Sequence, residues 1–151
     1  MNTHQQVYAL ITAFEQGTLP VKQWTHQAHV VMALWYLYYE PLPQARQRIK
    51  EGIKRYNESV GGSNTENSGY HETLTELYIR VVGHYLLSSA TNNFEKLLRH
   101  LSAQPFWKSH FPFSYYRQER LMSPIARRQW LSPDLRPLSD VSFVPFADES
   151  N

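Results

Sequence analysis

The segment spanning residues 24–39 has the most unusual pattern of apolar positions in the chain. Its sequence, WTHQAHVVMALWYLYY, opens with two histidines and is then almost wholly apolar and aromatic. On a helix His26, His29 and Val30 share one side, because residues three and four apart stack, and the opposite side is apolar too. A helix that is apolar all round is normally the central, buried one. The two histidines would then need partners, because an unsatisfied buried imidazole is costly.

Further segments show helical periodicity and the signals that start and end helices. Thr3 is a suitable N-cap and Gly17 a suitable end for the first helix, and Pro41 ends the central one. The helix after it is the clearest amphipathic one, and we interpret its basic outer face as solvated: Arg46, Arg48, Lys50, Lys54 and Arg55. Besides 24–39, the predicted helices cover residues 3–16, 43–60, 70 or 71–88, and 92 or 93–101.

The chain from residue 105 onward has a different texture. Aromatic residues alternate with prolines and a few polar groups, which predicts an irregular segment held down by its rings, with short helical turns at 117–121 and 124–130. Residues 139–151 show weak alternation without a partner strand, so we expect an extended or flexible tail there. The sequence thus predicts one all-α domain over residues 1–138, a bundle of about five main helices with an irregular aromatic-rich C-terminal segment.

Composition limits the functional classes. The length of 151 residues suits one compact domain, and the absence of cysteine excludes disulfides, thiolate zinc sites and cysteine nucleophiles. The formal net charge of +2 is small and does not favour a nucleic-acid partner. The longest apolar run, residues 30–39, is too short to span a bilayer, and no signal-peptide pattern is visible. We therefore expect a bacterial-type cytoplasmic protein with no nucleic-acid and no membrane partner.

The H-x-x-H spacing of His26 and His29 is that of half a metal site. A separation of three places both imidazoles on one helix face, within reach of one ion. His71, also at a helix start, is the best candidate for a third ligand. Three protein ligands and an open position would suit a divalent metal such as zinc, which turns bound water into hydroxide near neutral pH. The alternative is that these histidines are buried and satisfied by carboxylates, tyrosines or the backbone.

A second group of candidate residues is charged and lies in the C-terminal segment. Arginine clamps carboxylates and phosphates through its planar fork, so Arg117 or Arg120 would bind an anionic substrate if this segment covers the histidines. Glu119 or Asp134 would then act as the catalytic base or orient another catalytic group. The alternative is that these charges pair with one another and hold an irregular segment in place.

Four stretches carry a resemblance to known proteins: WTHQAH at residues 24–29, GYHET at 69–73, YYRQERLMSP at 115–124 and WLSPDLRPL at 130–138. In these the chain resembles a family of small bacterial all-helical proteins of unassigned activity. The resemblance covers most of the chain and implies no reaction. A looser similarity to DinB-like helical bundles implies a divalent metal held by three histidines. Their paired histidines are four apart and late in the chain, whereas His26 and His29 are three apart and early.

Two classes of function follow from these residues. The first is a metal-dependent enzyme of hydrolase or lyase type, which acts on a small anionic molecule. The second is a non-catalytic protein that binds a small-molecule ligand in a pocket lined by aromatic residues. Exposed rings also allow a self-association module, with a homodimer as its product. The rings expected to line the pocket of the second class are those of Trp24, Trp35, Phe106, Trp107 and Tyr115.

Overall fold

The computed structural model describes residues 2–146, and over this range the chain is helical and contains no β-strand. The all-α prediction with five main helices is confirmed. None of the helices in that range combines the length and apolar character needed to cross a bilayer. The α-helices are α1 His4–Gln16, α2 His26–Tyr39, α3 Leu42–Ser59, α4 Glu72–Ser88, α5 Phe94–Leu101, α6 Gln118–Leu121 and α7 Pro124–Arg128. The 3-10 turns are η1 Val21–Gln23, η2 Pro105–Trp107, η3 Phe111–Ser114 and η4 Leu138–Asp140.

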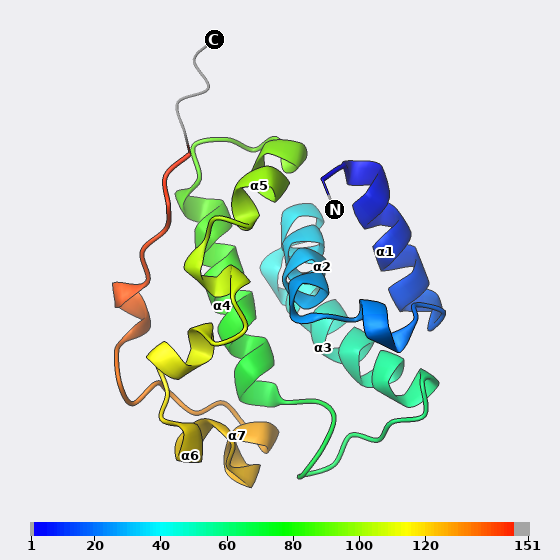
Figure 1. Cartoon of the computed structure of the whole chain (residues 1–151), viewed down its shortest axis with the longest axis vertical. Coiled ribbons are helices and arrows are strands. Elements are labelled where there is room, and N and C mark those ends of the chain that lie inside the picture. Colours follow the sequence, from blue (N-terminus) through cyan, green and yellow to red (C-terminus); the bar gives the residue numbers. More distant parts are fainter. Residues whose placement is uncertain (1, 147–151) are drawn as a thin grey trace.

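Helix α2 lies at the centre of the molecule, as its apolar sequence predicts (Figure 1). It packs against α1, α3, α4 and α5. Because no side of α2 carries a charged face, burial on every side is the arrangement that removes most apolar surface from water. Seven of its residues are buried: Ala28, Val30, Val31, Met32, Ala33, Leu34 and Tyr36.

Local capping explains where these helices begin and end. Thr3 caps α1 by accepting from the amide of Gln6, and Gly17 ends this helix in the left-handed conformation, with φ of 71°. Thr25 caps α2 by accepting from the amide of Ala28 at 3.2 Å. The cap on α2 places His26 at the first helical position and His29 one turn later.

The basic face of α3 is not simply solvated, contrary to our expectation. Arg46 and Lys50 are half-buried, and Arg46 Nε lies 2.9 Å from an oxygen of Glu76, which is only 6% exposed. Lys50 contacts both Glu72 and Glu76. A buried carboxylate needs such partners because charge alone in the interior is costly. The face of α3 beside α4 thus forms an ion-pair network.

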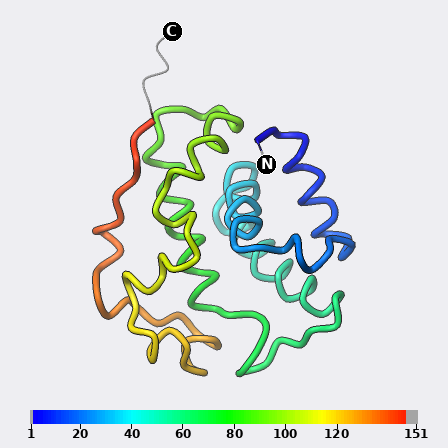
Figure 2. Tube along the Cα trace, viewed as in Figure 1, coloured from blue at the N-terminus to red at the C-terminus, as the bar shows by residue number. Residues whose placement is uncertain are grey.

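The C-terminal segment wraps over the outer side of α4 (Figure 2). Thr73, fully buried at the start of α4, donates to the carbonyl of Gln129 at 2.8 Å and accepts from the amide of Leu131 at 3.1 Å. Residues 141–146 are extended, and Val144 exchanges two backbone hydrogen bonds with the side chain of Gln104. The tail expected from residue 139 therefore begins within the 3-10 turn η4 and is extended and anchored from 141 to 146, whereas residues 147–151 lie outside the described range.

Replacing Thr73 with valine keeps the side chain's shape but leaves the Gln129 carbonyl and the Leu131 amide without their partner. We expect the free energy of unfolding to fall by about 1–3 kcal/mol in urea denaturation, because buried polar groups would be left unsatisfied. Thr75→Val is the matched control, since its hydroxyl donates to the His71 carbonyl, one turn earlier, and makes no hydrogen bond to the C-terminal segment. Equal losses in the two variants would contradict the docking role of Thr73.

Candidate functional site

A cavity of about 280 Å³ lies between α2, α3 and α4, and His26 and His29 are part of its wall. Most of the wall is aliphatic, and the polar groups come from the two histidines and from two residues of α4. A small, mainly apolar cavity with a few polar groups is the usual form of a small-molecule site. The remaining lining residues are Val30, Met32, Ala33, Ile49, Ile53, Leu74, Thr75, Tyr78 and Ile79.

His29 is held in one tautomer and one orientation. Its Nδ1 atom lies 2.7 Å from the carbonyl oxygen of Thr25, one turn earlier, and a carbonyl can only accept, so Nδ1 carries the proton. The ring stacks on Trp24 with 3.8 Å between centroids. Burial lowers the pKa of His29 to about 4, so the ring is neutral at pH 7 and Nε2 keeps its lone pair. His29 is thus a fixed hydrogen-bond acceptor in an apolar wall.

His26 is oriented in the same way by a carbonyl from a distant segment. Its Nε2 atom lies 3.2 Å from the backbone oxygen of Phe106 and must donate to it. Burial lowers the pKa of His26, and the nearby carbonyls of Phe106 and Trp107 oppose this shift only in part. The ring also meets Tyr78 edge-on at 5.2 Å between centroids. His26 therefore presents a neutral ring with the lone pair on Nδ1.

His71 does not join the other two histidines. It is the N-cap of α4, where Nδ1 accepts from the amide of Leu74 at 3.1 Å and Nε2 donates to the carbonyl of Leu121 at 2.8 Å. Both ring nitrogens are therefore used, and neither has a lone pair left for an ion. Among residues 2–146, no three histidine, aspartate or glutamate side chains lie together as a metal site would require. The geometry gives no support to the predicted site of His26, His29 and His71.

The four charged residues expected at the site lie in the C-terminal segment and away from the cavity wall. Asp134 accepts from the backbone amide of Arg117 at 2.9 Å. Arg120 donates through Nε to the carbonyl of Ser132 at 2.8 Å. Glu119 is exposed at the start of α6. Asp134 and Arg120 therefore serve the conformation of this segment, which is the alternative role that the sequence allowed.

Tyr78 is the residue of the cavity that the sequence analysis missed. Its hydroxyl is buried and makes no hydrogen bond to any part of the chain that the structure describes. Burial raises the pKa of this hydroxyl, so it remains a protonated donor. Native proteins leave few buried polar groups unpaired, and those they leave often lie near bound molecules or water. The signal available in the sequence was position: Tyr78 lies one turn after Leu74 on the apolar face of α4.

The wall of this cavity contains none of the five rings that we expected to line a pocket, which are those of Trp24, Trp35, Phe106, Trp107 and Tyr115. Tyr115 lines a separate hollow of about 110 Å³. Trp24 packs between His29 and Phe14, and Phe106 is fully buried against Tyr85. Neither ring is part of the cavity wall, which is built mainly from aliphatic residues of α2, α3 and α4. The histidine cavity is therefore mainly aliphatic, with Tyr78 as the aromatic residue in its wall.

The low pKa of His29 makes stability depend on pH. The unfolded chain binds a proton with the ordinary pKa of 6.5 and the folded chain only near 4, so the unfolded state holds more protons between these values. Stability is therefore fully present above pH 6.5 and is lost as the pH falls towards 4, by an amount on the order of 3 kcal/mol. His29→Phe should show a smaller loss across this window in urea denaturation. His110→Phe, at an exposed position, is the control, and equal slopes in both variants would refute this role.

The effect of removing the unpaired hydroxyl of Tyr78 can be compared with that of removing the paired hydroxyl of Tyr85. Tyr78→Phe removes a buried group without a partner, so we expect the free energy of unfolding to stay unchanged or to rise. Tyr85→Phe, two turns later on α4, removes a hydroxyl that donates to the Leu97 carbonyl at 2.8 Å and should cost about 1 kcal/mol. A loss of the same size for Tyr78→Phe in thermal denaturation would show that its hydroxyl is paired.

Comparisons of the chain with known protein families, with curated proteins and with solved structures found no match. The family resemblance carried by WTHQAH and GYHET therefore stays an expectation from sequence.

Proposed function

We propose that this protein binds a small, mainly apolar molecule carrying a hydrogen-bond donor, in the cavity between α2, α3 and α4. The observation that carries the proposal is the neutral, fixed imidazole of His29 in the wall of an aliphatic cavity. An acceptor in such surroundings gains more from a partner than it would in water, because the local dielectric is low.

The wall chemistry defines the class of ligand. Aliphatic side chains such as Val30, Ile49 and Ile79 favour an apolar body. The neutral rings of His26 and His29 each keep one lone pair, which favours an O–H or N–H group over a carboxylate. The volume of about 280 Å³ lies just below the usual range for drug-sized ligands, which favours a small ring system or a short branched molecule.

The metal-dependent enzyme remains a hypothesis from sequence that this geometry does not favour. A catalytic zinc is held by three protein ligands, and the third predicted one, His71, is engaged on both nitrogens. The predicted substrate arginines, Arg117 and Arg120, are not in the cavity wall. Binding without a metal therefore accounts for more of the observed arrangement.

A cycle of two ligands and two proteins tests the proposal. 1-Naphthol and naphthalene share a ring system and differ in one hydroxyl donor. We expect His29→Leu to weaken the binding of 1-naphthol by about 5- to 10-fold, the usual value of one hydrogen bond, and to leave naphthalene within about twofold. Affinities are measured by titration in NMR, where the methyl signals of Ala33 and Ile53 report whether the ligand lies in this cavity.

A filled cavity provides the control. Ala33→Leu adds bulk at a wall position that is 2% exposed and should abolish binding of both ligands while circular dichroism shows the helices intact. Two results would overturn the proposal: equal effects of His29→Leu on both ligands, and shifts confined to methyl groups outside the cavity.

A further inference from the structure

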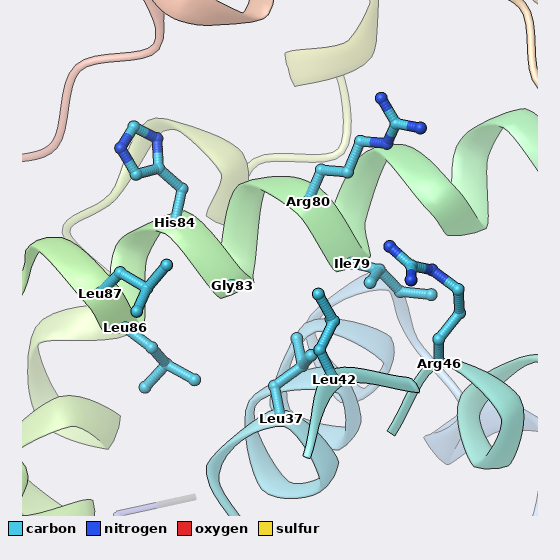
Figure 3. A pocket seen from close by; sticks show the side chains of 9 residues that line it. All are labelled: Leu37, Leu42, Arg46, Ile79, Arg80, Gly83, His84, Leu86 and Leu87. Atoms are coloured by element: carbon cyan, nitrogen blue, oxygen red, sulfur yellow. The ribbon is translucent and has the colours of Figure 1, made fainter. Parts of the chain in front are cut away.

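A second hollow lies on the opposite side of Ile79, in a groove between the C-terminal half of α4 and the corner where α2 meets α3 (Figure 3). Its volume is about 440 Å³, and Ile79 is the one residue that lines both this groove and the histidine cavity. The groove is lined by leucines along most of its length. Arg46 and Arg80 lie at one end of it and Leu86 and Leu87 at the other.

Gly83 forms part of the groove, and neither its backbone conformation nor the space around it requires a glycine at this position. It lies inside α4, where glycine weakens a helix relative to alanine, and its φ is not positive. A Cβ atom built at this position would meet no other atom within 4 Å. The bare backbone therefore leaves open space in the groove, and such space is what a closely bound ligand uses.

The apolar wall of the groove is unusually exposed. Leu87 is 88% exposed, although the other leucines of α4 are buried or partly buried, and Leu42 at the start of α3 is 49% exposed. Exposed leucines are ordinary when they are scattered, but here they line one continuous hollow. An alkyl chain in the groove would cover them both.

The charged side chains at one end of the groove favour a ligand with an anionic group beside its alkyl chain. Arg46 and Arg80 approach the buried Glu76 through Nε, at 2.9 and 3.9 Å, and Lys50 lies 3.8 Å from it. Together with Glu72 this makes three cations around two carboxylates. The guanidinium carbon of Arg80 lies 4.0 Å from the centroid of the Trp130 ring, a cation–π contact that leaves the N–H groups in the guanidinium plane available. The terminal guanidinium nitrogens of Arg46 and Arg80 form no hydrogen bond with any described residue. They are left to bind an anion through the fork that suits a carboxylate.

We propose that the groove binds a single-chain anionic amphiphile, with its carboxylate at Arg46 and Arg80 and its alkyl chain over Gly83 towards Leu87. Arg80 and Leu87 are seven residues apart on α4, or about 10 Å along its axis, which suits a chain of medium length. Two guanidinium groups at one end and leucines along the rest of the groove match a molecule with one anionic end and an alkyl chain. This site goes beyond the histidine cavity and does not depend on it.

Titration calorimetry with dodecanoate below its micelle concentration, and with its methyl ester, tests the proposal. We expect dodecanoate to bind at least about tenfold more tightly than the ester, because the ester keeps the chain but lacks the anion that Arg46 and Arg80 bind. Arg80→Gln should weaken dodecanoate by about 5- to 10-fold and leave the ester unchanged. Arg55→Gln, on the exposed face of α3, is the matched control and should change neither affinity.

Two substitutions at Gly83 separate binding from folding. Gly83→Ala should raise the melting temperature by a few degrees, since alanine favours the helix and meets no clash. Gly83→Leu should fill the groove and abolish dodecanoate binding, while 1-naphthol still binds in the histidine cavity.

Equal affinities for dodecanoate and its ester, or full dodecanoate binding by Gly83→Leu, would overturn the amphiphile site. Sedimentation that shows a dimer in wild type and a monomer in Gly83→Leu would assign the groove to a second copy of the chain, and would overturn it as well. Neither result bears on the binding of 1-naphthol, so the two sites are tested separately.

Discussion

Burial of α2 on every side is the constraint on which the rest of the structure depends. This helix carries no charged face to give to water, so α1, α3, α4 and α5 must surround it. These helices pack along α2, but side chains do not fill every space where three helices meet. The histidine cavity lies in one such space, where α2, α3 and α4 come together. The functional candidate is thus a consequence of how the core is assembled.

Backbone carbonyls determine which ring nitrogen carries the proton in His26, His29 and His71. Thr25, Phe106 and Leu121 each supply one carbonyl, and each fixes which ring nitrogen carries the proton. For His26 and His29 this leaves a free lone pair on a neutral ring. In His71 the lone pair accepts a hydrogen bond from the amide of Leu74 and so caps α4. The three histidines therefore have two different roles. The role depends on whether the ring nitrogen without a proton already accepts a hydrogen bond from the backbone.

The sequence predicted the helices well because the signals are local. Thr3, Thr25 and Gly17 act on neighbouring backbone, so their residue type alone is informative. The site was predicted less well, because the ring of His71 is fixed by a carbonyl fifty positions away and no spacing rule reports on that. Glu76 was missed for the same reason, since only the packing of α4 on α3 makes its carboxylate buried and paired.

The contacts at the start of α4 also bear on the order in which the molecule is made. His71 donates to the carbonyl of Leu121, which lies fifty positions later in the chain. Thr73 accepts from the amide of Leu131, which lies fifty-eight positions later. At a synthesis rate of about 5–20 residues per second, the ribosome adds those partners several seconds after α4. During that interval the start of α4 has the contacts with α3, such as that of Glu72 with Lys50, but not those with the C-terminal segment. The start of α4 therefore gains its full set of hydrogen bonds only after residues 121 and 131 have been added to the chain.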